Sequence, residues 1–155
     1  MLSEIHLFVI WERAFQHIDF ILNTIKENME IVEIYKYKCS FLKSVDIQKR
    51  LYEIPSETAI DKCIEHSFTN FFVVIVRIPC AVYITVNAHW GEAIVESTMY
   101  TVKENLRKTI NLPFCIHGTI NSIEAEHDIY VLTQNSTLYY DNYPLWNETI
   151  KEITL

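Results

Sequence analysis

The sequence predicts an α+β fold in which helices pack on one face of an antiparallel sheet. Three observations lead to this prediction. Short apolar segments alternate with segments that carry apolar residues every three or four positions, no glycine-rich turn follows the first apolar segment, and two connections between strand segments are short. A fully parallel, doubly wound sheet fits this pattern less well, because it needs a glycine-rich turn after the first strand.

The first half of the chain supplies two strands and the helices around them. Residues 5–11 form a short apolar run bounded by charges, which is typical of a buried strand. Residues 14–28 repeat apolar side chains at helical spacing and predict an amphipathic helix. Residues 30–39 nearly alternate between apolar and polar, as a half-buried strand does. A short helix is expected over 46–53, and Ser56 offers an N-cap for the next one.

The centre of the chain holds the segment with the strongest strand character. Residues 70–77 are almost all β-branched or aromatic, which places this strand in the middle of the sheet. Residues 81–86 follow a proline and predict either a further edge strand or a continuation of the same strand after a bulge. A helix is expected to begin near Glu92 or Ser97 and to end near Lys108.

The last third begins with a short strand over 114–116 that ends in His117. Asn121 or Ser122 caps a helix that continues to Leu132. The element order corresponds to two split βαβ units and predicts a ferredoxin-like sheet of the βαββαβ type. We expect one domain over residues 1–155, with a core over about 5–132 and an aromatic tail over 133–155 that becomes briefly helical.

Composition excludes several classes of protein. Half of the 155 residues are hydrophobic and the formal charge is −7, which excludes a disordered chain and disfavours nucleic acid and anionic membranes as partners. The four cysteines form no CxxC pair and no zinc spacing, so we expect buried thiols, a cytoplasmic protein and no metal site. The opening segment is interpreted as a strand and not as a signal peptide.

The most informative segment for function is CIHGTINSIEAEHDIYVL, residues 115–132. A strand delivers His117 to a surface, Gly118 allows the backbone to turn, and Thr119 offers a hydroxyl. The following helix carries Asp128 eleven residues after the histidine, which is enough chain to return beneath the imidazole. A carboxylate there would fix one ring nitrogen as a donor and make the other more basic, as a nucleophilic or general-base histidine requires.

This segment resembles the motif of the nucleoside diphosphate kinases. His-Gly-Thr at 117–119 is similar to the family's His-Gly-Ser, and Ala-Glu-His-Asp-Ile at 125–129 is similar to its Ala-Glu-x-Glu-Ile at the same spacing. The resemblance implies a nucleotide-binding fold in which His117 accepts a phosphate and Asp128 orients the His117 imidazole. Trp11-Glu12-Arg13 stands where the family has Lys-Pro-Asp, so the residues that handle the phosphoryl group are the ones that differ.

A weaker resemblance is to small bacterial nucleotide-sugar pyranose mutases of surface-polysaccharide gene sets. It is carried by VIWERA at 9–14, by the spacing of Lys103 and Arg107, and by the His117 segment. It implies a nucleoside-diphosphate sugar whose pyranose and furanose forms are interconverted. No flavin fingerprint is present, so we expect no cofactor and acid-base or covalent histidine chemistry.

The predicted site assigns a role to each residue. Lys103 and Arg107, four residues apart on a helix, would hold the diphosphate. Glu12 or Glu96 would serve His117 as a proton partner, and Tyr52 or Trp11 would stack on the base. The hydroxyl of Thr119 is expected to bind the substrate as well.

Three functions remain open at this point. The first is a nucleotide-sugar isomerase, which the missing phosphoryl-handling residues favour. The second is a kinase-like phosphotransferase, and the third is a catalytically silent nucleotide-binding or assembly module. The expected partner is a nucleoside diphosphate or its sugar conjugate, and the exposed aromatic tail favours a strap or a homo-oligomer contact.

Overall fold

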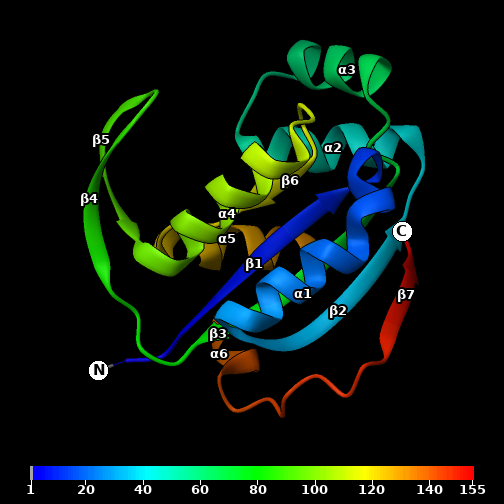
Figure 1. Cartoon of the computed structure of the whole chain (residues 1–155). Helices are drawn as coiled ribbons and strands as arrows, with labels where there is room; N and C mark the ends of the chain where they lie inside the picture. The colour runs from blue at the N-terminus through cyan, green and yellow to red at the C-terminus, as the bar shows by residue number, and fades with distance from the viewer. Residues whose placement is uncertain (1) are drawn as a thin grey trace.

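The computed structural model describes residues 2–155 and consists of a mixed sheet, a separate hairpin and helices on both sides of the sheet (Figure 1). In chain order the elements are β1 (Glu4–Trp11), the 3-10 helix η1 (Glu12–His17), α1 (Ile18–Asn28), β2 (Glu30–Lys38), α2 (Phe41–Tyr52), α3 (Ser56–Glu65), β3 (Asn70–Ile78), β4 (Tyr83–Ala88), β5 (Gly91–Glu96), α4 (Ser97–Ile110), β6 (Ile116–Gly118), α5 (Ser122–Thr133), α6 (Thr137–Asp141) and β7 (Ile150–Thr154).

The main sheet has the order β6-β1-β3-β2-β7. Neighbouring strands are antiparallel except for β2 and β7, which run parallel. Without β7, the strand order is that of the ferredoxin-like βαββαβ arrangement, so the predicted fold class is confirmed. The continuous apolar run over 70–77 lies in β3 at the centre of the sheet, as expected.

Helices cover both faces of this sheet, which corrects the expectation that they pack on one face. On one face Phe8 and Ile10 of β1 pack with residues of α1 and α4. On the other face Val9 and Trp11 of β1 pack with residues of α2, α3, α5 and α6. The strands of the sheet are buried on both sides, which explains why β1 and β3 are continuously apolar and do not alternate.

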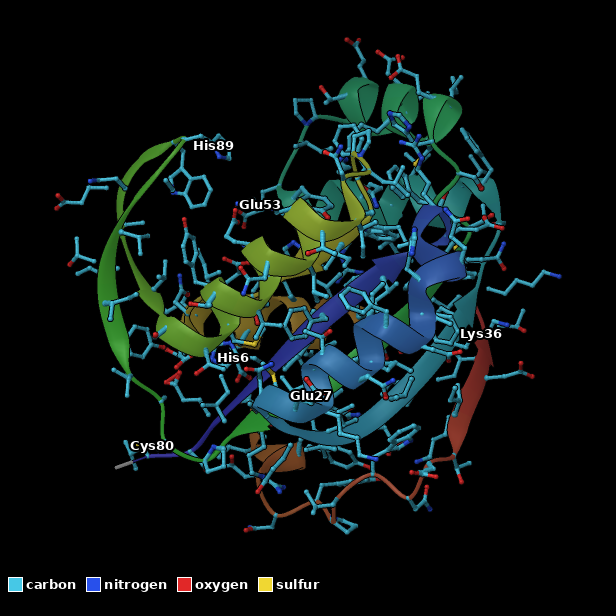
Figure 2. The ribbon with its side chains drawn as sticks, in the orientation of Figure 1. His6, Glu27, Lys36, Glu53, Cys80 and His89 are labelled. Carbon is cyan, nitrogen blue, oxygen red and sulfur yellow. The ribbon has the colours of Figure 1, made fainter. Side chains whose placement is uncertain are left out.

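A hairpin replaces the strand predicted over 81–86. β4 and β5 pair only with each other and form an arm that projects from the body of the molecule (Figure 1). His89 lies at the tip of this arm (Figure 2). The segment 81–86 is therefore neither an edge strand of the main sheet nor a continuation of β3.

The C-terminal tail closes the fold with a strand, where a short helix was expected. β7 pairs with β2 from Ile34↔Ile150 to Lys38↔Thr154 and extends the sheet at its edge. Arg77 of β3 holds the start of the tail by donating Nη2 hydrogen bonds to the carbonyls of Tyr140 (3.1 Å) and Tyr143 (2.6 Å). The tail thus acts as a strap on the domain and also contributes to its sheet.

The opening apolar segment is the buried strand β1, as predicted. Within residues 2–155, no helix has both the length and the apolar character that crossing a bilayer requires. Three cysteines are buried as expected, whereas Cys80 is exposed in the turn after β3 (Figure 2).

Candidate functional site

Strand pairing determines the direction in which His117 points. His117 lies opposite Val9 of β1, so its side chain is on the face of the sheet that α5 covers. Gly118 lies opposite Phe8 and faces α4. A Cβ on Gly118 would lie 3.0 Å from the Phe8 ring and 3.2 Å from the Lys103 side chain, so a larger residue would fit only if these side chains shifted by a few tenths of an ångström.

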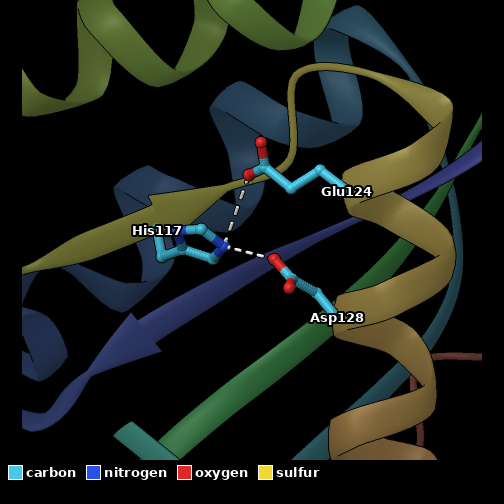
Figure 3. A group of neighbouring side chains, drawn as sticks. All are labelled: His117, Glu124 and Asp128. Atoms are coloured by element: carbon cyan, nitrogen blue, oxygen red, sulfur yellow. Dashed lines mark hydrogen bonds and ion pairs between the residues drawn. The ribbon is translucent and has the colours of Figure 1, made fainter. Parts of the chain in front are cut away.

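His117 and Asp128 form the pair that the sequence spacing predicts (Figure 3). The His117 Nε2 atom lies 2.7 Å from Asp128 Oδ2, and the Asp128 side chain is 1% exposed. Nε2 is therefore the protonated ring nitrogen that donates to the carboxylate. No residue among 2–155 makes a hydrogen bond to Nδ1, so in the neutral ring with its proton on Nε2 this nitrogen has a free lone pair.

Two further side chains complete the surroundings of this pair. Glu124 Oε1 lies 3.7 Å from His117 Nε2, and His127 Nδ1 lies 2.8 Å from Asp128 Oδ1. Burial raises the pKa of the Glu124 carboxyl and the charge of Asp128 adds to this, whereas His117 opposes the shift. The sequence analysis assigned a role to neither residue. The four-residue spacing of Glu124 and Asp128 is the signal that identifies them as neighbours on one helix face.

A cavity of about 550 Å³ lies on the α5 side of His117. Its wall contains three carboxylate residues, two histidines and four others, namely Glu53, Glu124, Asp128, His117, His127, Leu51, Tyr52, Asn121 and Ile123. Among residues 2–155 no lysine or arginine lines this cavity. We call it the acidic pocket.

A second cavity of about 440 Å³ has the opposite character. It is lined by cationic, aromatic and apolar residues, namely Lys62, Arg107, Trp11, Tyr52, Phe114, Leu112, Pro113, Cys115 and Ile116. Within the described part of the chain no carboxylate lines it. We call it the cationic pocket. Tyr52 lines both cavities.

Lys62 is the residue of the cationic pocket that sequence reasoning missed. Its Nζ lies 4.1 Å from the ring centroid of Tyr52, 5.2 Å from that of Phe114 and 5.7 Å from that of Phe68. Burial lowers the pKa of Lys62. No carboxylate of residues 2–155 forms an ion pair with this ammonium group, so an anion from solution can approach it. Nothing in the sequence around position 62 distinguishes it from other helix lysines.

The loop before β6 is held in an unusual backbone conformation. Phe114 has a φ of 54°, in the left-handed region that residues with a Cβ seldom occupy. Arg13 fixes the loop by donating a hydrogen bond from Nη1 to the Pro113 carbonyl at 3.0 Å. The ring of Phe114 lies over His66 at 4.7 Å between centroids and closes one wall of the cationic pocket.

Lys103 and Arg107 support the strand that carries His117. Lys103 donates from Nζ to the Gly118 carbonyl at 3.2 Å, and Arg107 donates from Nε and Nη2 to the Ile116 carbonyl at 3.1 and 3.0 Å. Burial, helped by the charge of Arg107, lowers the pKa of Lys103 to about 8. Arg107 lines the cationic pocket, whereas Lys103 lines neither pocket. Of the two residues that were expected to hold one diphosphate, only Arg107 therefore lines one of these pockets.

The two residues predicted as proton partners lie away from His117. Glu12 accepts a hydrogen bond from Asn70 at 3.5 Å and lines a small separate cavity beside Arg13. Glu96 is buried and accepts from the backbone N–H groups of Val82 and Met99, which makes it the N-cap of α4.

The remaining predicted substrate ligands have different positions. Tyr52 contacts His117 edge to face at 5.1 Å between ring centroids, and burial raises the pKa of its hydroxyl. Trp11 is 1% exposed and packs on Phe68, so it supports the wall of the cationic pocket. Thr119 is fully buried and its Oγ1 lies 3.0 Å from His6 Nδ1, which keeps its hydroxyl inside the fold.

Comparison with known proteins identifies the fold. No family model and no curated protein matches the sequence. The structure is similar to that of the nucleoside diphosphate kinase of Aquifex aeolicus, with a TM-score of 0.51 over 84% of this chain and 94% of that chain. The chain has a nucleoside diphosphate kinase-like fold. The sequence identity of the two proteins is 15%, so the likeness establishes the architecture, and none of the comparisons supports a resemblance to sugar mutases.

Proposed function

We propose that this chain binds a nucleoside phosphate in the cationic pocket and that His117 Nδ1 accepts a phosphoryl group from it. The observation that carries the proposal is the His117–Asp128 hydrogen bond of 2.7 Å, which leaves Nδ1 of the neutral ring unprotonated. Tyr52, which contacts the His117 ring, also lines the pocket that contains Lys62 and Arg107. The kinase-like fold is compatible with this reading.

The chemistry of the cationic pocket suits a nucleotide. Lys62 and Arg107 provide positive charge for phosphate oxygens, and Arg107 has a fork of donors that matches them. The exposed ring of Phe114 provides an apolar surface for a base. We expect the phosphates on this side of Tyr52, because the three carboxylates of the acidic pocket repel anions.

The transfer step requires no base. The Nδ1 lone pair forms a bond to the terminal phosphorus, and the bond between that phosphorus and its bridging oxygen breaks, so that a nucleoside diphosphate leaves. The ring proton stays on Nε2, where the Asp128 carboxylate stabilises the positive charge that develops on the imidazole.

The sugar-ring isomerase hypothesis has less geometric support. It required Lys103 as a phosphate ligand and Glu12 or Glu96 as a proton partner. Lys103 is bound to the Gly118 carbonyl, Glu12 lines a separate cavity and Glu96 caps a helix. We therefore retain the phosphotransfer proposal.

Nucleotide binding is tested by titration calorimetry with ADP and GDP. Lys62→Gln should weaken binding about tenfold, since losing one charged contact of about 1.4 kcal/mol has that effect. Lys49→Gln is the matched control, because Lys49 is an exposed lysine on the neighbouring helix α2. Absence of binding at millimolar nucleotide, or equal affinity of both variants, contradicts the proposed pocket.

Phosphoryl transfer is tested separately with ATP labelled in its terminal phosphate. We expect an acid-labile, alkali-stable label on the wild type and none on His117→Asn. His89→Gln serves as the control, because His89 lies at the tip of the hairpin arm (Figure 2). Nucleotide binding without any label would refute the phosphoacceptor role and leave a nucleotide-binding module.

A further inference from the structure

Three side chains with metal-binding atoms converge in the acidic pocket. His117, Glu124 and Asp128 each place one such atom within 4.8 Å of the others (Figure 3). β6 provides the imidazole, and α5 provides the two carboxylates four residues apart on one helix face. The Nε2 atom of His117 faces both carboxylates, at 2.7 Å from Asp128 and 3.7 Å from Glu124.

The charge around these atoms is unbalanced. The Asp128 side chain is 1% exposed, and its hydrogen-bond partners within residues 2–155 are the two imidazoles of His117 and His127, which carry no fixed charge. Burial raises the pKa of Glu124, and the positive charge of Lys103 opposes this shift. However, the Lys103 ammonium group donates its hydrogen bond to the Gly118 carbonyl and makes no ion pair with Glu124 within 4.0 Å. Buried carboxylates without a cationic partner are costly, and a cation placed between them would remove this cost.

We propose that the acidic pocket binds one divalent transition-metal ion of the Zn²⁺ or Mn²⁺ type through His117 Nε2, Glu124 and Asp128. A mixed imidazole and carboxylate donor set suits these ions, whereas Mg²⁺ and Ca²⁺ prefer oxygen donors alone. Three protein ligands leave at least one coordination position for water or an added ligand, and the cavity of about 550 Å³ has room for it. His127, at 2.8 Å from Asp128, would orient that carboxylate from outside the ligand set.

Metal binding has a consequence for the other nitrogen of His117. An ion at Nε2 occupies the lone pair there, so the single proton of the neutral ring must reside on Nδ1. The metal-loaded histidine then cannot attack phosphorus through Nδ1. Metal binding and phosphate acceptance are therefore alternative states of one residue; this consequence rests on the proposed function, whereas the metal site itself does not.

The metal site is tested by calorimetric titration of chelator-treated protein with ZnCl₂ and with MnCl₂, without any nucleotide. All variants carry Cys80→Ser, because an exposed thiol also binds Zn²⁺. We expect one ion per chain and an affinity at least about tenfold lower for Glu124→Gln. Glu126→Gln is the matched control, since Glu126 is on the same helix and binds Thr137, outside the acidic pocket.

The outcome is clear in either direction. One-to-one binding that Glu124→Gln weakens and Glu126→Gln preserves supports the site. The proposed site is overturned if the chain does not bind one metal ion, or if Glu124→Gln and Glu126→Gln change the metal affinity equally. Both outcomes are independent of whether the protein binds nucleotides. As a second measurement on the wild type, Zn²⁺ should shift both ring ¹⁵N resonances of His117 more than those of any other histidine and should move Nδ1 to the position of a protonated nitrogen. Unchanged His117 resonances would contradict the proposal.

Discussion

Replacing Asp128 with asparagine tests the central pair of the site. Asp128 accepts from His117 Nε2 at 2.7 Å through one oxygen and lies 2.8 Å from His127 Nδ1 through the other. Asparagine keeps the shape and one acceptor oxygen but removes the charge. His127 is 40% exposed and can turn or change its tautomer, so the amide oxygen is expected to face the more buried His117.

The expected magnitude follows from the lost charge. A hydrogen bond to a charged group contributes about 1.5–3 kcal/mol, and a neutral one contributes about 0.5–1.5 kcal/mol. The difference of about 1–1.5 kcal/mol corresponds to about a fivefold to tenfold decrease in the preference for the Nε2–H tautomer of His117. If His117 accepts phosphate, its rate of labelling should fall by a similar or larger factor.

The assay is long-range ¹H–¹⁵N correlation NMR, which distinguishes protonated from unprotonated ring nitrogens. We expect the wild-type spectrum to show Nε2 of His117 protonated and Nδ1 unprotonated. His127→Gln is the control, because it removes only the second partner of the carboxylate and should leave this pattern in place. An identical His117 tautomer balance in wild type and Asp128→Asn would refute the role assigned to Asp128.

Two further predictions concern the scaffold around the site. Because burial lowers the pKa of Lys103 to about 8, the folded chain loses this proton before the unfolded chain does, so this lysine contributes stability that rises from about pH 8 to pH 10.5. The increase in the free energy of unfolding over this pH range is of order 3 kcal/mol at most. Urea unfolding of Lys103→Met should show no such increase. If the free energy of unfolding of wild type and Lys103→Met changes with pH in parallel, the prediction is wrong. Arg77→Met removes hydrogen bonds to the carbonyls of Tyr140 and Tyr143 and should destabilise the chain by about 2–5 kcal/mol, with faster proteolysis after residue 133 as the specific readout. Cleavage at the wild-type rate would show that the tail is held elsewhere.

The sequence predicts the elements whose signals are local. β1 and β3 are recognisable because strands buried on both faces are continuously apolar. The His117–Asp128 pair is predictable because its signal is also local in sequence. One strand, one turn and one helix bring the side chains of two residues eleven positions apart together. The helix cap at Asn121, which accepts from the Glu124 N–H at 2.8 Å, is also encoded within four residues.

The sequence does not predict features that depend on distant segments. β7 carries no distinctive pattern of its own and becomes a strand by pairing with β2 more than a hundred residues earlier. The hairpin of β4 and β5 is exposed on both sides for most of its length, so its residues do not alternate as those of a half-buried strand do. Helical periodicity places Lys103 and Arg107 on one face of α4, but it does not reveal that this face packs against β6, whose carbonyls bind both side chains.

The distribution of charge around Tyr52 depends partly on residues that lie far from the His117 motif in the sequence. Motif spacing identifies His117, but it does not predict that Lys62 of α3 and Arg107 of α4 line one pocket, because only the folded chain brings these two residues together. On the opposite side, Glu53, Glu124 and Asp128 create a site that favours cations. His117 lines the acidic pocket, and its Nε2 atom faces Asp128 and Glu124 there. In the two roles proposed for His117, the position of its ring proton decides between metal binding at Nε2 and phosphate acceptance at Nδ1. The effect of Zn²⁺ on phosphohistidine formation would measure this choice directly.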